Sequence, residues 1–572
     1  MGCHFPELIA TVLVSCTTVC FAAGASAPVN NPGRQLLEQT QRGAVPGPGQ
    51  ALAPQAERAP GAANPYEPKF PIRKIEILGV TRLSREEVRQ LAGRYENRAL
   101  GVSDINVLME AITRAYVKRG YITTRVYLPE QNIRGGTLRL NVIEGRLGSF
   151  STSTVKRSQI ASAFPTRPGS IIRLPDLEQG MDQLERATSI HPKIELLPGS
   201  KEGTSIVALS SVNTFPAHLA FGVDNLGNPI TGEWRWLAES GVDNLLRIND
   251  VWQASYQHSD HSNAVAGSVI LPFRWWTLTT SASYAQYNET LAPDLVLTNR
   301  ATTFSERLEQ VLFRNTQHRF AFSLGFDWTE TTRELLGDFL TPTRSASFSG
   351  ILSDTWQIPN HFLSAAIIYQ EGFPIFGVHE DPSGLPQEAP HSEFQLLKLA
   401  MSYYDTAYKF VTWRSDLVAQ YAFEGLLSEQ QLYLSDPFAV RGWNQITIAA
   451  DRGFVWRNEL ILRLDLPAEK EGKLSWLTLG HALVPYLFND LGYADSTNTT
   501  SAFVVSIIWC GPAPDLWPIC SGRILCCSLW KFVVAGEFAH VLSNRACNGV
   551  LGAPAARARL GSGFGASRVG TI

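Results

Sequence analysis

The stretch "FAFSLGFDWT", residues 320–329, alternates strictly between large apolar and small or polar side chains. Successive side chains of a strand point to opposite faces, so the two sets would lie on opposite sides of one strand. The apolar set is Phe320, Phe322, Leu324, Phe326 and Trp328. The small or polar set is Ala321, Ser323, Gly325, Asp327 and Thr329. A strand of this length with one face for lipid and one for a polar lumen is typical of a transmembrane β-barrel.

The same alternation recurs along residues 213–509. It is seen in "HLAFGVD" (218–224), "LVAQYAF" (417–423) and "ELILRLDL" (459–466), whose outward-facing residues are predicted to be Leu219, Phe221, Val223, Leu417, Ala419, Tyr421, Phe423, Leu460, Leu462 and Leu464. Tryptophans near the predicted strand ends would form an aromatic girdle: Trp234, Trp236, Trp252, Trp275 and Trp276. Soluble β-sandwiches also alternate, but this many repeats after an export signal favour an antiparallel outer-membrane barrel over residues 213–509.

The N-terminal residues read as an export signal and a tether. Residues 1–27 combine an apolar run, Leu8 to Ala23, with the small-residue sequence Ala25-Ser26-Ala27, which predicts a cleaved signal peptide despite an opening without Lys or Arg. Leu13 to Cys16 resembles a lipoprotein box, a weaker alternative. Residues 28–43 suit a short polar helix, and residues 44–70 are dominated by Pro, Gly and Ala, which predicts a semi-extended linker.

Two consecutive segments, residues 71–145 and 146–212, each show the order β-α-α-β-β, so they form an internal repeat. In the first, we expect Ser84 and Ser103 to cap the two helices at their N-termini. The net charge of −3 gives no basic excess for neutralising phosphates, which argues against a nucleic-acid partner.

The start of the predicted barrel resembles a known family. The stretch "DNLGNPITGEWRWLAESGVDNLLRINDVW" (224–252) resembles the first barrel hairpin of two-partner-secretion transporters, the haemolysin/haemagglutinin-activator family. The matching positions are Asp224, Asn225, Gly227, Thr231, Gly232, Asp243, Asn244, Asn249 and Asp250. The two repeats resemble that family's polypeptide-transport-associated (POTRA) domains, and residues 28–43 its plug helix. The resemblance covers about residues 30–509 and implies a barrel of 16 strands.

A long loop also resembles this family. "LSEQQLYLSDPFAVRGW" (427–443) is similar to its inward-folded extracellular loop, whose tip corresponds to Val440, Arg441, Gly442 and Trp443. Ser435-Asp436-Pro437 stands where the family usually has two glycines. "LFNDLGYA" (487–494) resembles the family's barrel-wall motif, carried here by Phe488, Asp490 and Gly492.

The chemistry of Arg441 and Asp490 supports the same pairing. A loop that enters a wide barrel needs an anchor, and a carboxylate can accept two hydrogen bonds from the planar guanidinium. Asp490 is expected on the lumen side of its strand. In a water-filled lumen such a pair would contribute about 1 to 3 kcal/mol, enough to hold a loop that can still be released.

Enzymatic chemistry has no support in the sequence. There is no phosphate-binding loop, nucleophile elbow or zinc-spaced Cys/His set, so we expect no cofactor, no metal and no catalytic residue. His258 and His261 are expected in an exposed loop rather than at a metal. Asp224, Asp243 and Asp250 are expected to shape turns and lumen polarity.

The tail departs from the family pattern after Trp509. Five of the eight cysteines lie there, namely Cys510, Cys520, Cys526, Cys527 and Cys547, and clean alternation stops. We expect residues 510–572 to be an atypical tail. Our hypothesis is that a frameshift produced it, which would leave the barrel unclosed. Alternating strands in another reading frame downstream of codons 505–512 would support this, and a divergent ending is the alternative.

Together these features predict a non-enzymatic translocator in the outer membrane, with its POTRA domains in the periplasm. These domains would bind an unfolded exoprotein, an adhesin, haemolysin or contact-dependent toxin, and a monomeric barrel would secrete it. The alternative is a Bam-type insertase that assembles other barrels, although that class usually has more than two periplasmic repeats and lacks the plug helix and tether. The two periplasmic repeats argue against a third class, the passive porin.

Overall fold

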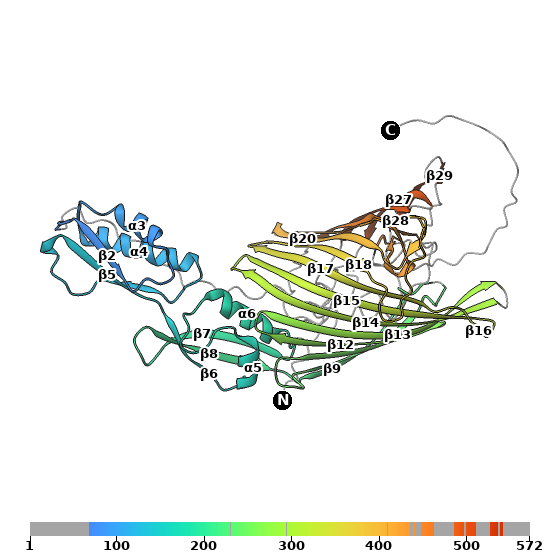
Figure 1. Ribbon diagram of the computed structural model, residues 1–572, viewed down its shortest axis with the longest axis horizontal. Helices are drawn as coiled ribbons and strands as arrows, with labels where there is room; N and C mark the ends of the chain where they lie inside the picture. The colour runs from blue at the N-terminus through green and yellow to red at the C-terminus, as the bar shows by residue number, and fades with distance from the viewer. Residues whose placement is uncertain are drawn as a thin grey trace, which may run out of the picture.

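A computed structural model shows two small α/β domains followed by a large antiparallel sheet (Figure 1). The structure describes residues 68–228, 230–292, 295–408, 410–434, 439–441, 448–462, 486–496, 499–510, 527–535 and 538–540. The predicted signal peptide, plug helix and nearly all of the linker lie outside these residues. Among the described residues, no helix is long and apolar enough to cross a membrane.

The first domain packs two helices on a three-stranded sheet. Its elements are β1 (Phe70–Ile72), β2 (Lys74–Leu78), α3 (Arg85–Gly93), β3 (Arg98–Leu100), α4 (Val102–Lys118), β4 (Arg125–Tyr127), η1 (Ile133–Gly135) and β5 (Thr137–Ile143). The sheet has the order β2-β5-β4, with β2 parallel to β5, and β1 pairs with β3 beside it. The buried face of α4, with Leu108, Ile112 and Tyr116, covers Leu138 and Leu140 of β5.

The two helix caps differ from each other. Ser84 caps α3 as predicted, because its side chain accepts from the backbone N–H of Glu87 and Glu87 accepts in return from Ser84. The prediction for Ser103 is wrong, since α4 begins at Val102 and its N-cap is Gly101, two residues before Ser103. There the Asp104 carboxylate accepts from the Gly101 N–H at 3.0 Å.

The second domain repeats the β-α-α-β-β order, so the predicted tandem of two such units is confirmed. It consists of β6 (Arg146–Thr152), α5 (Arg157–Ala163), α6 (Leu174–Glu185), β7 (Ile190–Pro198) and β8 (Thr204–Asn213). The sheet order is β6-β8-β7, with β6 parallel to β8. Its core includes Leu147, Phe164, Leu177, Leu184 and Val207.

Most of the remaining strands form one closed antiparallel barrel. Its strands are β9 (Ala217–Asp224), β10 (Arg235–Asp243), β11 (Val251–Ser259), β12 (Ser262–Phe273), β13 (Trp276–Ala292), β14 (Leu295–Arg314), β15 (His318–Leu335), β16 (Asp338–Phe339), β17 (Thr343–Ile358), β18 (His361–Gly372), β20 (Gln395–Tyr408), β21 (Val411–Ala422), β25 (Arg452–Leu462), β26 (Tyr486–Ser496), β27 (Thr499–Cys510), β28 (Cys527–Ala535) and β29 (Phe538–His540). Within the described residues the barrel has sixteen strands besides β16, whose two residues pair antiparallel with the end of β15.

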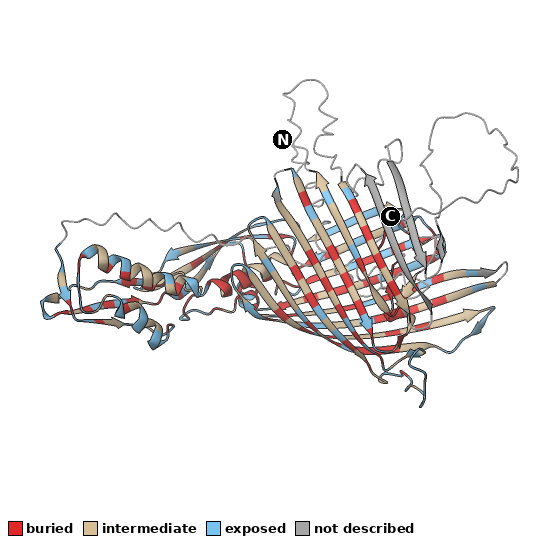
Figure 2. Cartoon of the chain, turned by 90° about the horizontal axis from the view of Figure 1, so that it is seen from above, coloured by how far each residue is buried: buried red, intermediate tan, exposed pale blue. Residues whose placement is uncertain are grey.

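The barrel strands alternate as the sequence predicts. Along β15, Ala321, Ser323 and Gly325 are buried, whereas Leu324 between them is 55% exposed. Buried and more exposed positions alternate in the same way along neighbouring strands (Figure 2). The small, buried face therefore lines the interior, and the large apolar face is presented outward, where lipid would cover it.

The prediction that the barrel remains unclosed is wrong. Strand β27 contains Trp509, and strands β28 and β29 continue the sheet beyond it and complete the ring with β9. Strand pairing uses backbone N–H and C=O groups, so a segment can join a ladder without clean side-chain alternation. The sequence of β28, "CSLWKFVVA", also contains the aromatic and β-branched residues that strands favour.

Candidate functional site

The described residues of the connection between β21 and β25, which spans residues 423–451, contact the interior face of the barrel. Its described parts contain β22 (Gly425–Leu426), η2 (Ser428–Gln430), β23 (Leu432–Tyr433) and β24 (Ala449–Ala450). Strands β23 and β24 pair as a short hairpin, and Leu434 N–H extends it by donating to the Ile448 carbonyl at 2.9 Å. We call residues 423–451 the inner loop.

Arg441 binds Asp490 through three donors. Its backbone N–H donates to Asp490 Oδ2 at 3.0 Å, Nε donates to the same oxygen at 2.7 Å, and Nη2 donates to Oδ1 at 2.6 Å. Asp490 lies on β26 and is 0% exposed. The structure therefore brings together the loop arginine and the wall aspartate that the sequence singled out.

A second carboxylate and an aromatic ring complete the surroundings of Arg441. Nη1 donates to Glu459 Oε1, and the guanidinium carbon lies 3.7 Å from the centroid of the Phe488 ring. Glu459 of β25 is the direct register partner of Phe488. Sequence analysis missed Glu459, although it precedes the outward-facing Leu460 and so alternates to the interior. Two carboxylates and a π-face thus hold one cation.

The tip of the inner loop packs on the wall at Gly492. Val440 is 0% exposed, and a Cβ added to Gly492 would lie 2.8 Å from both Leu434 Cδ2 and Val440 Cγ2. The surrounding buried cluster consists of Val418, Leu432, Leu434, Ala439, Val440, Ala450, Val455 and Ala494. The expected water-filled setting of the ion pair is therefore wrong here, because apolar packing beside it keeps the carboxylate dry. Gly442 and Trp443 lie outside the described residues.

The residues that resemble the family's first barrel hairpin lie in two groups, one at each end of β10. At one end, Asp224 accepts from Arg235 Nε at 2.7 Å and from Nη2 at 2.8 Å. Position 227 requires glycine because a Cβ there would lie 2.0 Å from the Gly232 carbonyl oxygen. Gly232 itself has a φ of +112°, a conformation that favours glycine. Thr231 is buried, and its carbonyl accepts from Ser259 Oγ at 2.6 Å. Asn225 is exposed.

At the other end, the turn between β10 and β11 docks on the second domain. Asp243 Oδ2 accepts from the Ser189 N–H at 2.8 Å, and Asn249 Nδ2 donates to the Gln159 carbonyl at 2.9 Å. The Asn244 side chain accepts from Gln159 Nε2 at 3.1 Å.

Asp250 shapes the same turn from inside, since its carboxylate accepts from the Leu246 N–H at 2.9 Å and from Trp252 Nε1 at 2.7 Å. The expected turn-shaping role fits Asp250. The docking role of Asp243, Asn244 and Asn249 was not predicted from sequence.

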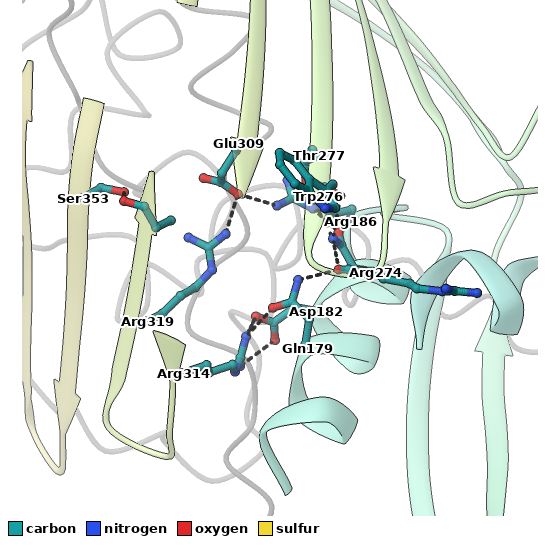
Figure 3. Close-up of polar contacts among 12 residues, drawn as sticks. Gln179, Asp182, Arg186, Arg274, Trp276, Thr277, Glu309, Arg314, Arg319 and Ser353 are labelled. Carbon is teal, nitrogen blue, oxygen red and sulfur yellow. Dashed lines mark hydrogen bonds and ion pairs between the residues drawn. The ribbon is translucent and has the colours of Figure 1, made fainter. Parts of the chain in front are cut away.

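Helix α6 makes a second contact with the barrel (Figure 3). Gln179 and Gln183 both donate to the Arg274 carbonyl at 2.8 Å, in the turn between β12 and β13. Arg314, at the end of β14, donates to Asp182 from both terminal nitrogens. We call these contacts of α5 and α6 with the strand turns the domain junction.

Deeper in the junction, Glu309 of β14 links the domain to the barrel wall. Its Oε1 accepts from Arg319 Nη2 at 2.5 Å and lies 3.6 Å from Arg186 Nη2 of the second domain (Figure 3). The second domain is thus fixed to one rim by partly buried ion pairs and by hydrogen bonds to backbone carbonyls. No sequence motif marks these positions.

The two histidines considered for metal binding lie at the β11–β12 hairpin. His258 Nδ1 contacts Asn263 Oδ1 at 2.9 Å across the β11–β12 hairpin. Over the described parts of the chain, no group of three or more His, Cys, Asp or Glu side chains is placed to hold a metal ion.

Comparisons with known proteins agree with this architecture. Residues 203–508 match the family model described as haemolysin secretion/activation protein ShlB/FhaC/HecB. Residues 70–145 match the ShlB-type POTRA domain, and residues 146–198 match a further POTRA domain model.

Individual relatives include named transporters. The outer membrane transporter CdiB of Dickeya dadantii (strain 3937) is 32% identical over 409 residues, which cover 69% of this chain and 72% of that protein. The hemolysin transporter protein ShlB of Serratia marcescens is 27% identical over 419 residues, covering 70% and 73%. The solved structure of CdiB from Escherichia coli superposes with a TM-score of 0.75 at 24% identity, covering 90% of this chain and 96% of that one, and shares the fold.

The family consists of outer-membrane transporters rather than enzymes, with POTRA domains in the periplasm and a barrel that secretes exoproteins. The tandem α/β domains and the barrel of this chain correspond to that plan. The chain belongs to the haemolysin secretion/activation protein ShlB/FhaC/HecB family of two-partner-secretion transporters.

Proposed function

We propose that the inner loop is the gate of this transporter and that Arg441 and Asp490 hold it closed. The observation that carries the proposal is the three-donor contact of Arg441 with a fully buried Asp490. A contact between a loop and a wall strand, rather than between two neighbouring strands, can break without opening the barrel ladder. Its release would let the loop move and widen the path for a polypeptide.

The two POTRA domains receive the exoprotein in this proposal. The sheet order β6-β8-β7 leaves the nine-residue β7 at an edge of the second domain, with Leu197 39% exposed. An extended segment of an unfolded exoprotein can add to such an edge through backbone hydrogen bonds. The domain junction would then keep the captured segment next to the periplasmic mouth of the barrel.

We further propose that residues 28–43 act as a plug helix that leaves the barrel together with the gate, and that residues 44–70 tether it. The Pro- and Gly-rich composition of the tether suits a chain that must follow such a movement. The monomer is the functional unit, because one chain supplies all strands of the closed barrel.

The exoprotein itself is proposed from the relatives. Similar proteins are named as a hemolysin transporter, heme/hemopexin transporters and CdiB transporters. We propose an exoprotein of the adhesin, haemolysin or contact-dependent toxin type, encoded beside the gene of this chain.

Co-expression tests the proposal. The chain and the product of the neighbouring large secreted-protein gene are expressed in a host that lacks both, and exoprotein is measured in the medium and the periplasm. We expect secretion that depends on the chain. Appearance of the exoprotein in the medium without the chain would contradict this function, and a general defect in assembly of other barrels on its removal would favour an insertase.

A further inference from the structure

A second carboxylate of the inner loop, far from Arg441, also binds the barrel wall. Glu429 lies in η2 and is 8% exposed. Its Oε1 accepts from Thr331 Oγ1 at 2.6 Å, and its Oε2 accepts from Ser345 Oγ at 3.1 Å. Both carboxylate oxygens are therefore engaged by wall hydroxyls, and these two hydroxyl groups belong to side chains that are buried themselves.

The two hydroxyls converge because of the strand register. Thr331 is on β15 and Ser345 on β17, and the pairs Thr329–Ser345 and Thr331–Thr343 place them diagonally on the same interior face. Diagonal neighbours on one face of an antiparallel pair are close enough for one side chain to touch both. The wall thus presents a two-hydroxyl site that matches one carboxylate.

The neighbouring residue continues the attachment. Gln430 accepts from Gln370 Nε2 of β18 at 3.3 Å through its side chain, and its carbonyl accepts from Gln420 Nε2 of β21 at 3.0 Å. Arg441 then contacts β25 and β26. The inner loop is therefore attached at several points along an arc of the wall from β15 to β26, and Glu429 and Arg441 hold opposite ends of that arc.

We propose that Glu429 is a second latch of the gate, which positions the base of the inner loop independently of its tip. This inference rests on the gate function proposed above. Breaking the Arg441 contact frees only the tip, while the base stays bound to β15 and β17, so full opening requires both contacts to be broken. Hydrogen bonds from the two hydroxyls to the Glu429 carboxylate are charge-assisted, so they hold the base of the inner loop on the wall more firmly than bonds between neutral groups would.

Channel recordings test the latch without knowledge of the exoprotein. The full-length protein is purified from outer membranes, and its conductance is measured in planar lipid bilayers in KCl. Glu429→Ala is expected to raise the time spent in large-conductance states several-fold, as is Arg441→Ala. The double variant is expected to exceed either single variant, because it frees both ends of the arc.

The hydroxyl partners supply the decisive comparison. The pair Thr331→Val with Ser345→Ala should reproduce the Glu429→Ala recordings and should add nothing when combined with Glu429→Ala. The control pair, Ser323→Ala with Ser349→Ala, removes two buried hydroxyls from the same strands and should behave as wild type. Heat-modifiable migration in gels verifies that each barrel is folded. If Glu429→Ala does not fold, the variant with Thr331→Val and Ser345→Ala still tests the proposal.

Each outcome has a definite meaning. Wild-type conductance of both Glu429→Ala and the hydroxyl pair, with altered conductance of Arg441→Ala, would overturn the second latch alone. Additive effects of Glu429→Ala and the hydroxyl pair would also overturn it, since they would then act separately. Wild-type behaviour of the Arg441 variant as well would remove the proposed gate itself.

Discussion

Arg441 donates to Asp490 from its backbone N–H as well as from its guanidinium, so the two residues are joined both by side chains and by the path of the loop. The backbone contact means that the aspartate also fixes the direction in which the chain passes the wall. The guanidinium, in turn, neutralises a carboxylate that has no access to water. Replacing Arg441 should therefore have different consequences from replacing Asp490.

Arg441→Ala should be more damaging than Asp490→Asn. Loss of the cation leaves the buried Asp490 carboxylate beside the partly buried Glu459 carboxylate. Breaking a buried pair by removing one partner typically costs about 3 to 5 kcal/mol. Asp490→Asn keeps an oxygen acceptor for the backbone N–H, and Arg441 keeps Glu459. We expect both variants to reduce secretion while the barrel stays in the membrane, with the larger loss for Arg441→Ala.

Secreted exoprotein and heat-modifiable barrel are measured together for these variants. Arg300→Ala is the matched control, because Arg300 pairs with Glu334 in a partly exposed ion pair that does not involve the inner loop. Full export by both Arg441→Ala and Asp490→Asn would show that the contact does not control the gate.

Gly492→Val should displace the loop tip without changing any charge. A Cβ at this position already approaches Leu434 and Val440 to 2.8 Å, and the extra methyl groups of valine need space that the buried cluster does not have. Overpacking of this kind commonly costs about 1 to 3 kcal/mol. We expect more frequent large-conductance states in planar bilayers, as for Arg441→Ala. Gly267→Ala is the control, since its nearest atom would lie at 3.6 Å, and equal conductance of Gly492→Val and wild type would contradict the packing role.

Local periodicity and motif resemblance could predict the barrel strands, the two α/β domains and the pairing of Arg441 with Asp490. Glu459 was within reach of the same alternation, but no motif drew attention to it. The contact of Glu429 with Thr331 and Ser345 could not be predicted, because it joins residues that become neighbours only when β15, β17 and the loop are placed together. The failure at the tail has a different origin: closure depends on backbone pairing, which side-chain alternation reports only indirectly.

Arg314→Ala should loosen the domain junction. Arg314 is the cation beside Asp182 and Glu178 of α6, and Glu178 is almost completely buried. Burial raises the pKa of Glu178, and the charge of Asp182 raises it further, whereas Arg314 lowers it. Loss of Arg314 would leave uncompensated acidic groups at the contact. We expect faster hydrogen–deuterium exchange in α6 and lower secretion, with the inner loop unaffected.

Hydrogen–deuterium exchange is measured in the full-length Arg314→Ala protein and in wild type, for peptides from α6 and from β23. Arg146→Ala is the control, since Arg146 donates to the Gly169 carbonyl within the second domain at an exposed position away from the barrel. Unchanged exchange in α6 of Arg314→Ala would show that the backbone acceptors at Arg274 suffice to hold the junction.

Glu144 should make the first domain sensitive to acid. Its Oε1 accepts from Thr81 N–H at 2.7 Å, Arg82 N–H at 3.0 Å and Tyr116 Oη at 2.7 Å, so it ties the end of β5 to α4 and to the segment after β2. Burial alone would raise the pKa of Glu144, but the hydrogen bonds from Thr81, Tyr116 and Arg82 outweigh it and hold the pKa below the ordinary range.

The sign of the pH effect follows from this lowered pKa. The stabilisation is fully present above the pKa of an unfolded glutamate, about 4.3, and is lost as the pH falls through the lower folded value. Glu144→Gln lacks this ionisation. Hydrogen–deuterium exchange of residues 79–84 should therefore be faster in the variant than in wild type at pH 7, and the two rates should become similar near pH 3. Glu86→Gln, at an exposed site of α3, should match wild type throughout. A difference between Glu144→Gln and wild type that persists unchanged into acid would mean that side-chain shape, rather than the carboxylate charge, holds this corner of the domain.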